Sequence, residues 1–231
     1  MSTFGTQTRA LATSAISRKP RQGRSLASFE RMLEATKALM LERGSEDFTL
    51  QDVSERGNVS IGSIYLRFES KDRLLHAVIA QELEQVIAGE RAMIDEVLAQ
   101  SGSLAEFLPL YIDRYSRFLA ENAALLRTIM QRAAIDPAVS GPGRETAQRS
   151  ARMSLDAIMT FRDEIGGADP EIKVQAVFQI IFATIARQYG LGATAESGDE
   201  KVWTLMKPEL SRMALAYLLF DEQSSIRPAD R

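Results

Sequence analysis

The stretch from Thr49 to Lys71 reads TLQDVSERGNVSIGSIYLRFESK and decides how the amino-terminal third of the chain folds. Thr49 and Asp52 have the spacing of a capping box, in which each side chain bonds to the other residue's backbone N–H, so a helix should begin here. Gly57-Asn58 is typical of a turn, because Gly adopts positive φ freely and Asn tolerates it. The helix should therefore end just before this pair.

A second short helix is expected directly after the turn. Ser60 is its expected N-cap, and the apolar residues Val59, Ile64 and Phe68 recur at helical spacing. The outward face is then small, mixed and partly apolar, and consists of Ser60, Ile61, Ser63, Leu66 and Arg67. Two short helices joined in this way predict a helix-turn-helix whose second helix has the shape needed to enter a major groove.

The run from Val59 to Lys71 closely resembles the recognition-helix signature of the TetR family of transcriptional regulators, roughly V-S-x-G-[ST]-[IL]-Y-x-[HYR]-F-x-[SN]-K. The resemblance extends upstream through residues 32–36 and Gly44. Three sites depart from the usual pattern: Ser45 replaces an aromatic residue, Gly57-Asn58 replaces Ala-Gly, and Leu66-Arg67 replaces a polar or aromatic residue followed by His. Only the last departure affects which operator sequence would be read.

The resemblance implies an all-α fold, with a three-helix helix-turn-helix DNA-binding head and a larger helical ligand-binding and dimerisation bundle. It also implies three partners, namely a palindromic double-stranded DNA operator, a second copy of the chain and a small-molecule effector. Base-edge contacts would fall to Gln51, Ile61, Gly62, Ser63, Leu66 and Arg67, and DNA-backbone contacts to Thr49, Ser60, Tyr65 and Lys71. Among these, Arg67 could donate two hydrogen bonds to guanine.

The composition excludes several kinds of chemistry. The chain has 231 residues, of which 45% are apolar and 26% charged, as is usual for a globular protein in water. It has no Cys and a single His, His76, so we expect no disulfide, no metal site, no cofactor and no catalytic constellation. No apolar run is long enough to span a bilayer and no secretory signal is present, so we expect a cytoplasmic protein that is not an enzyme.

Charge is distributed unevenly along the chain. Residues 1–80 contain twelve Lys/Arg and nine Asp/Glu, whereas the remainder contains sixteen and twenty-two, which together give the net charge of −3. Because phosphate contacts are local, the positive balance of the first segment is compatible with DNA binding even though the whole chain is acidic.

Four segments are expected. Residues 1–24 should be a disordered basic arm, residues 25–72 the helix-turn-helix domain, residues 73–221 the helical ligand-binding and dimerisation domain, and residues 222–231 a disordered tail. Two interpretations of the first segment stay open: a solvated tail, or an arm that lies along phosphates or in a minor groove.

Beyond the head, periodicity and caps predict helices over residues 70–99, 103–119, 123–135, 144–165, 170–189 and 199–220, with a loop over 136–143. The helix over 170–189 is apolar nearly all round between Val174 and Ala186, which predicts that it packs with the last helix in a four-helix dimer interface. The alternative is a central helix of a monomeric bundle.

The residues expected to line an effector pocket are aromatic, Met or Arg residues of the carboxy-terminal bundle: Tyr111, Arg114, Tyr115, Phe118, Met130, Phe178, Phe182 and Trp203. Such residues at helical spacing also suit a plain core. Burial of Arg114 or Arg187 would favour an anionic ligand. The function that fits best is a dimeric repressor released from its operator by a ligand. The alternatives are an activator or ligand-blind regulator of the same family, and a non-specific architectural DNA binder.

Overall fold

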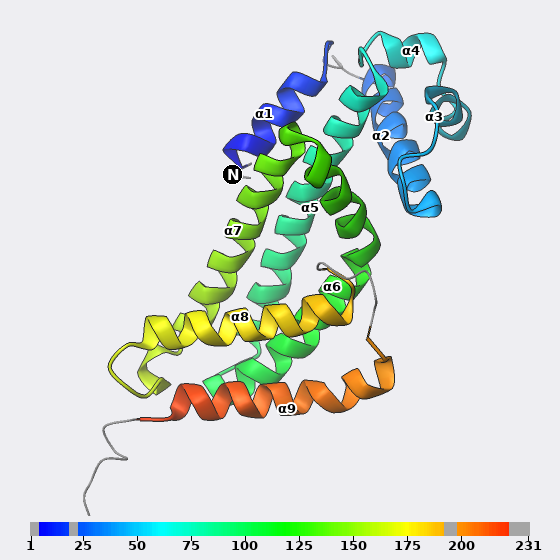
Figure 1. The fold of residues 1–231 in the computed structure, drawn as a ribbon. Coiled ribbons are helices and arrows are strands. Elements are labelled where there is room, and N and C mark those ends of the chain that lie inside the picture. The colour runs from blue at the N-terminus through cyan, green and yellow to red at the C-terminus, as the bar shows by residue number, and fades with distance from the viewer. Residues whose placement is uncertain (1–4, 19–22, 192–197, 222–231) are drawn as a thin grey trace, which may run out of the picture. The chain divides into compact units, whose positions relative to one another are not determined.

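The computed structural model describes residues 5–18, 23–191 and 198–221. Over these residues it contains nine α-helices, one short 3₁₀ helix and no strand, which confirms the expected all-α fold (Figure 1). The elements are α1 (Thr6–Ala15), α2 (Arg24–Arg43), α3 (Leu50–Gly57), α4 (Ile61–Tyr65), α5 (Lys71–Ala99), α6 (Leu104–Ile135), α7 (Pro137–Met159), η1 (Arg162–Glu164), α8 (Pro170–Gln188) and α9 (Glu200–Leu219).

The chain forms two compact units, and neither follows the boundary expected at residue 72. The first unit comprises Met1–Ile87 and Ala124–Gln148, and the second comprises Ala88–Ala123 and Arg149–Arg231. Helices α5, α6 and α7 each contribute to both units. The difference arises because α5 runs without a break through residue 72, while Leu125, Ile129 and Val139 join the apolar core of the head.

Helices α2, α3 and α4 form the three-helix head, and its local signals are those expected from the sequence. The Thr49 hydroxyl accepts the Asp52 N–H at 3.1 Å, and the Asp52 carboxylate accepts the Thr49 N–H at 2.8 Å, which completes the capping box. Asn58 has the positive φ of the turn, 47°, while Gly57 is the last helical residue. Gly44 ends α2 in the left-handed conformation.

The amino-terminal segment departs from expectation, since residues 6–15, expected to be disordered, form helix α1. Its start is capped by a side chain distant in sequence: the Glu145 carboxylate accepts the N–H groups of Thr6, Gln7 and Thr8 at 2.8–3.2 Å. Leu11 and Ala15 are buried in the core of the first unit. Composition gave no sign of this helix because its cap and its apolar contacts come from residues far along the chain.

Two further expectations about the helices are wrong. The segments 103–119 and 123–135 form one helix, α6, and the loop expected over 136–143 is mostly the start of α7. Asp136 caps α7 by accepting the Ala138 N–H at 2.9 Å. Gly141 and Pro142 are buried, and a Cβ on Gly141 would come within 2.2 Å of the Gln7 side chain of α1. Tertiary packing therefore overrides the turn preference of this Gly-Pro-Gly sequence.

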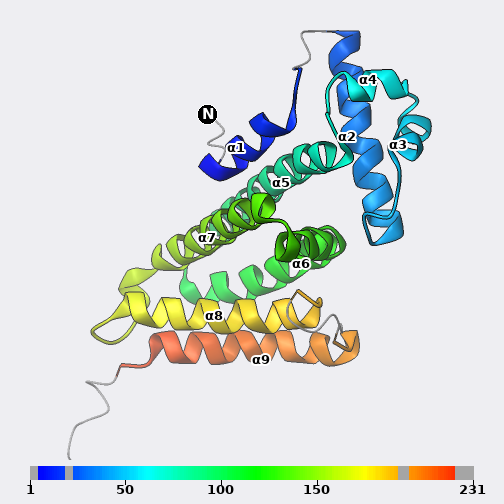
Figure 2. The same ribbon diagram turned by 45° about the horizontal axis from the view of Figure 1, so that its top comes forward.

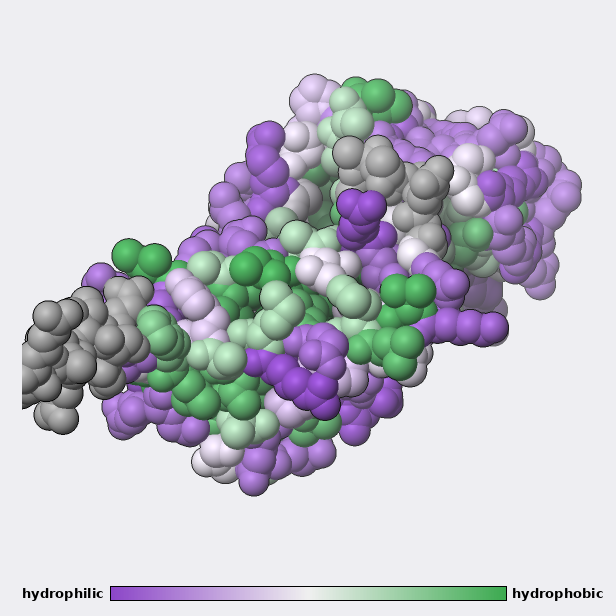
Figure 3. Space-filling view, turned by 60° about the horizontal axis from the view of Figure 1, so that its bottom comes forward, coloured by the Kyte–Doolittle hydropathy of each residue, from purple (hydrophilic) through white to green (hydrophobic). Residues whose placement is uncertain are grey.

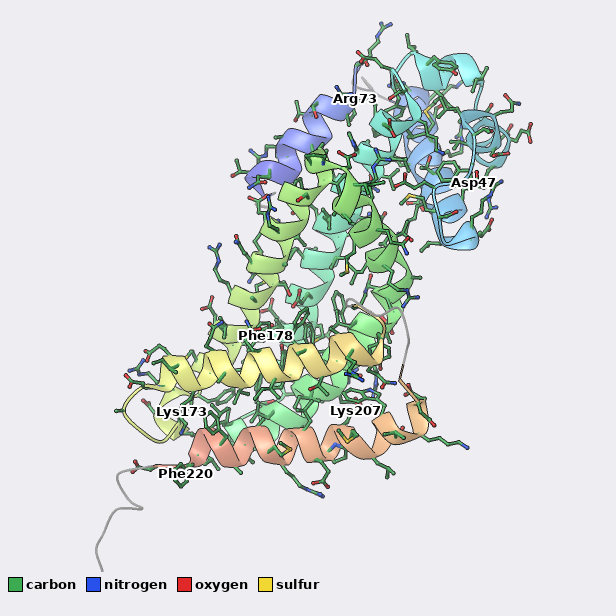
Figure 4. All side chains as sticks on the ribbon, viewed as in Figure 1. Asp47, Arg73, Lys173, Phe178, Lys207 and Phe220 are labelled. Atoms are coloured by element: carbon green, nitrogen blue, oxygen red, sulfur yellow. The ribbon has the colours of Figure 1, made fainter. Side chains whose placement is uncertain are left out.

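In the second unit, α8 and α9 lie side by side (Figures 1 and 2). Lys173 of α8 fastens the end of α9, since its Nζ donates to the carbonyls of Gly166, Leu218 and Phe220 at 2.7, 3.1 and 2.6 Å (Figure 4). A side chain on Gly166 would meet the carbonyl oxygens of residues 219 and 220 at 2.7–2.8 Å, so this crossing requires glycine. These contacts fix how the two helices pack on one another.

Candidate functional site

The exposed side of α3 and α4 carries most of the residues expected to contact DNA. The Ser60 hydroxyl caps α4 by accepting the Ser63 N–H at 3.2 Å. Exposed residues on this side are Thr49, Gln51, Ser60, Gly62, Tyr65 and Leu66, while Ile61 and Ser63 are half-buried. We refer to these eight residues as the α3–α4 face. It is held by Ile64 and Phe68, which are fully buried beneath it.

Gly62 leaves room on this face, because a Cβ there would meet no atom within 4 Å and its backbone is open to a partner. Tyr65 and Leu66 are 59% and 51% exposed, which is unusual for large apolar side chains in the same short segment. An exposed apolar side chain on a short helix suits contact with a thymine methyl group or a sugar.

Arg67 differs from the other nine residues expected to contact DNA, because it is only 7% exposed. Its Nη2 donates to the Ser25 Oγ at 2.8 Å and to the Ser25 carbonyl at 3.2 Å, and its Nη1 donates to the Arg18 carbonyl at 3.2 Å. The guanidinium also lies 5.8 Å from the centre of the Phe29 ring. In this conformation it is occupied within the protein and is not presented to a base edge.

Lys71 is half-buried at the start of α5. Its ammonium donates to the Glu46 carbonyl and lies 4.5 Å from the centre of the Phe48 ring. The Lys71 ammonium has three donor hydrogens, so these contacts leave it able to donate to a phosphate as well.

An ionic cluster around Arg132 ties the end of α6 to the head within the first unit. The Arg132 guanidinium bonds to Glu46 at 2.8 Å, to Asp72 at 2.9 Å and to Asp136 at 2.7 Å, and His76 lies 2.7 Å from Asp136. Burial opposes ionisation of Asp136, but the hydrogen bonds from His76 and Arg132 outweigh it and lower the pKa of Asp136 to about 2. His76 therefore has a structural role in this cluster.

A buried polar cluster lies in the second unit. Glu90 of α5 is 1% exposed and accepts a hydrogen bond from the Ser150 hydroxyl of α7 at 2.7 Å. The hydroxyls of Tyr111 and Ser154, both fully buried, face one another without the geometry of a hydrogen bond, and neither has a partner among the described residues. Burial raises the pKa of Glu90 to about 7, against the opposing effect of the Ser150 hydrogen bond.

The walls of this cluster are aromatic. The rings of Phe107, Tyr111 and Tyr115 stack in succession along α6, with centroids 5.3 Å apart at each step. One helical turn from Glu90 and Ser154, a surface hollow of about 170 Å³ lies between α5 and α7. Its lining residues are Arg91, Ile94, Asp95, Leu98, Met153, Asp156, Ala157 and Thr160.

Two kinds of feature are absent from the part of the chain that the structure describes. No helix there is long and apolar enough to cross a lipid bilayer. Within the same residues, no group of three or more His, Asp or Glu side chains is arranged to hold a metal ion.

Comparison with known proteins agrees with this geometry. Residues 32–78, which span most of α2 through the first part of α5, match the sequence model of bacterial regulatory proteins of the tetR family. Over residues 32–78 the chain is similar to regulators of the tetR family. This confirms the resemblance seen in the residues from 59 to 71.

Two relatives of this chain are described as transcriptional repressors. The HTH-type transcriptional repressor KstR of Mycolicibacterium smegmatis is 29% identical over 114 residues, which are 49% of this chain and 53% of that protein. KstR of Rhodococcus jostii is 39% identical over 57 residues, which are 25% of this chain and 27% of that protein. The chain thus matches about half, or less, of the length of these relatives.

Solved structures share the fold. A protein of Mesorhizobium loti described as a TetR-family transcriptional regulator has a TM-score of 0.63 at 18% identity, covering 85% of this chain and 96% of that chain. Salmonella enterica GusR has a TM-score of 0.60 at 19% identity, covering 85% and 97%. These TM-scores show a shared fold, and at identities below 25% the similarity shows the fold alone.

The residues expected to line an effector pocket separate into three groups by exposure. Tyr111, Tyr115, Phe178 and Trp203 are buried, Phe118 is half-buried, and Arg114, Met130 and Phe182 are exposed. Met130 also belongs to the first unit, apart from the other seven. The indole of Trp203 donates to the Ser116 hydroxyl at 2.9 Å, so this side chain is fully satisfied as core.

Sequence reasoning missed Glu90, Ser150 and Ser154. One signal was available for Glu90: it lies three residues after Ile87 and four before Ile94, and so occupies a position on the apolar stripe of α5. An acid on such a stripe is expected to be buried. Arg114 and Arg187 are both exposed, so the condition set for an anionic ligand is not met.

Proposed function

We propose that this protein is a homodimeric transcriptional repressor that binds a palindromic operator and releases it when a small molecule occupies the second unit. The observation that carries the proposal is the α3–α4 face, where an N-capped short helix exposes a glycine together with hydroxyl and apolar side chains above a buried apolar core. Such a helix, set behind a first helix and a tight turn, is the arrangement that enters the major groove.

Roles on the DNA follow from chemistry and exposure. Gln51 offers an amide for adenine, while Ile61, Leu66 and the open backbone at Gly62 suit thymine methyl groups and sugars. Thr49, Ser60, Tyr65 and Lys71 carry hydroxyl or ammonium donors suited to phosphates. Ser63 completes the base-facing set. We leave Arg67 out of this set because its guanidinium is occupied.

The proposal of a dimer is supported by α8 and α9. Their exposed large apolar residues are Ile172, Ile180, Phe182, Val202, Leu205, Met206, Met213, Tyr217, Leu219 and Phe220, the last directly after α9. Figure 3 shows apolar side chains gathered over the face on which these helices lie. A face of this kind suits a second copy of the chain packed about a two-fold axis. Two heads would then reach half-sites about 34–36 Å apart.

The effector site that we propose is the polar cluster of Glu90, Tyr111, Ser150 and Ser154. Buried polar groups without partners are costly, and a ligand that supplies the missing hydrogen bonds would remove that cost. The stacked aromatic rings beside the cluster favour a ligand with an apolar, planar body.

Selection of bound duplexes from a randomised library tests the proposal. We expect the selected duplexes to contain a palindrome with half-sites one helical turn apart. Leu66→Ala should relax the preference at one position of each half-site, whereas Lys71→Ala should weaken binding to all sequences alike. Equal losses on selected and random duplexes for both variants would contradict this division of roles.

Two alternatives are separable by experiment. An architectural DNA binder would be displaced equally well by random and selected DNA in competition, whereas the repressor should resist random competitor. An activator, or a regulator without an effector, would bind the same operator and differ only in where the operator lies relative to a promoter.

A further inference from the structure

Residues 67–69, directly after α4, are tied to the segment that follows α1. The Ser17 N–H donates to the Arg67 carbonyl at 2.8 Å, and the Arg67 guanidinium donates in return to the Arg18 carbonyl at 3.2 Å. The Ser17 hydroxyl lies 3.4 Å from the Glu69 carboxylate. Two consecutive residues of the amino-terminal segment thus hold the carboxyl end of the short helix on the α3–α4 face.

The opposite end of α1 is fastened to two other helices of the same unit. Glu145 of α7 accepts three N–H groups in the first turn of α1, and Glu84 of α5 accepts the Gly5 N–H at 2.9 Å. Carboxylates at this position accept hydrogen bonds from N–H groups that have no partner within the helix. Their negative charge also interacts favourably with the positive end of the helix dipole. The start of α1 therefore depends on α7.

Between its two ends, α1 is held by packing. Thr8, Leu11 and Ala15 are at most 4% exposed and fall on one face of the helix. Leu11 and Ala15 belong to the same apolar core as Val139 of α7 and Ile64 of α4. If α7 moved at Glu145, α1 would therefore move with it as one rigid helix. Residues 17 and 18, which follow α1, would be displaced as well.

We infer that α1 holds α4 in position, because Glu145 binds the start of α1 and the residues after its end bind Arg67. We call α1 in this role the strap. This inference rests on the proposed DNA reading by the α3–α4 face. It makes Arg67 a positioning residue and assigns the amino-terminal segment a role in operator affinity that does not require it to touch DNA.

A charge effect of Glu145 would act in the opposite direction. Removing this carboxylate makes the chain less negative, which by itself strengthens binding to phosphates. A loss of affinity in a Glu145 variant would therefore not be a charge effect, and a change in the position of α4 would account for it.

The test is a double-mutant cycle on the full chain, with the duplex selected by the wild-type protein. Glu145→Ala and Arg67→Ala should each weaken binding by roughly three- to tenfold, as expected for lost capping and bracing bonds. The double variant should bind about as well as the weaker single variant, because both changes release the same strap. Gln148→Ala, a change at an exposed position of α7, is the matched control and should bind like the wild type.

When two residues share no contacts, the effects of their substitutions on the free energy usually add. Additive losses in the double variant would overturn the inference. It would equally be overturned if Arg67→Ala altered base preference while Glu145→Ala bound normally, since Arg67 would then be a base reader. If Arg67→Ala does not fold, Arg67→Lys takes its place in the cycle. Lys keeps the positive charge and the aliphatic part of the side chain but lacks the two terminal nitrogens of the guanidinium.

Hydrogen exchange gives a readout that does not depend on an operator. In Glu145→Ala the amides of residues 66–69 should exchange faster than in the wild type and in Gln148→Ala. If the chain selects no duplex, the proposed function fails while this readout still decides on the strap. Unchanged exchange at 66–69 together with faster exchange at 6–15 would contradict the strap even if DNA binding is found.

Discussion

Gly57 and Gly62 lie five residues apart but are constrained by different physical requirements. At Gly57 a Cβ would come within 3.0 Å of the Arg31 carbonyl and 3.3 Å of the Ala35 Cβ, so α3 and α2 touch at backbone distance. At Gly62 a Cβ would meet nothing within 4 Å. One glycine is needed for packing and the other leaves the α3–α4 face open.

Gly57→Ala should therefore destabilise the protein by about 1–3 kcal/mol, the usual cost of forcing an extra methyl group into a close contact. Gly62→Ala should leave the free energy of unfolding unchanged or raise it by up to about 1 kcal/mol, since Ala favours a helix. Urea unfolding followed by circular dichroism measures both. Equal stability of the two variants would contradict the close approach of α2 and α3.

Glu90 makes the free energy of unfolding depend on pH, and the direction of this dependence follows from its pKa. Its pKa is raised from 4.5 to about 7, so the folded state holds a proton that the unfolded state releases between these values. The contribution of this group to stability is therefore fully present below pH 4.5 and is lost as the pH rises toward 7.

Glu90→Gln, which cannot ionise, should remove that dependence. At pH 8 it should raise the free energy of unfolding by up to about 3 kcal/mol relative to the wild type, and the difference should vanish toward pH 4.5. Urea unfolding at a series of pH values measures this. Glu96→Gln, at an exposed position of the same helix, is the control and should show no such trend. If the free energies of unfolding of Glu90→Gln and the wild type differed by the same amount at all pH values, Glu90 would already be ionised in the folded protein.

The sequence predicts individual residues well where the cause is local. The capping box of Thr49 and Asp52, the N-cap Ser60 and the positive φ of Asn58 all depend on neighbours within a few positions. Arg67 and Glu90 were not anticipated in their actual places, because their partners lie 42–60 residues away along the chain.

At the scale of elements, the same division between local and distant causes explains which helices were predicted. The long helix α5 and the closing helix α9 have N-cap residues within their own segments, Ser70 and Asp199, and both appear as expected. Helix α1 depends on Glu145, and the start of α7 depends on burial under α1, so neither is encoded in its own segment.

Lys173→Met tests how α8 holds α9. The variant keeps the length of the side chain but removes the ammonium that donates to two carbonyls at the end of α9, those of Leu218 and Phe220, and to the carbonyl of Gly166, so we expect a loss of about 1–3 kcal/mol in the free energy of unfolding. Hydrogen exchange at residues 216–220 should also become faster. Lys201→Met, at an exposed position near the start of α9, should change neither. An unaltered α9 end in Lys173→Met would show that the carbonyls find other partners.

At the scale of the whole molecule, one unit carries the α3–α4 face and the other carries the exposed apolar residues of α8 and α9. The apolar composition of α8 and α9 could indicate from the sequence that a face of these helices packs against a partner. Ten large apolar residues there are exposed. The sequence could not indicate which side of each helix would be left open, because that depends on how α8 and α9 pack on α6.

Leu205→Glu tests the dimer. Leu205 is 75% exposed, so the change should leave the fold intact and produce a monomer at micromolar concentration, with a large loss of operator affinity because two linked heads bind together. Sedimentation velocity measures the first effect. Ile135→Glu, at an 80% exposed position of the first unit, is the control and should remain dimeric. A wild-type protein that sediments as a monomer would refute the two-fold assembly directly.

Hydrogen–deuterium exchange of the full chain, with and without its selected duplex, measures whether the α3–α4 face binds DNA. We expect new protection concentrated in residues 49–71, with the largest change across α4 and the start of α5. Protection elsewhere, with residues 49–71 exchanging as fast as in the free protein, would contradict it.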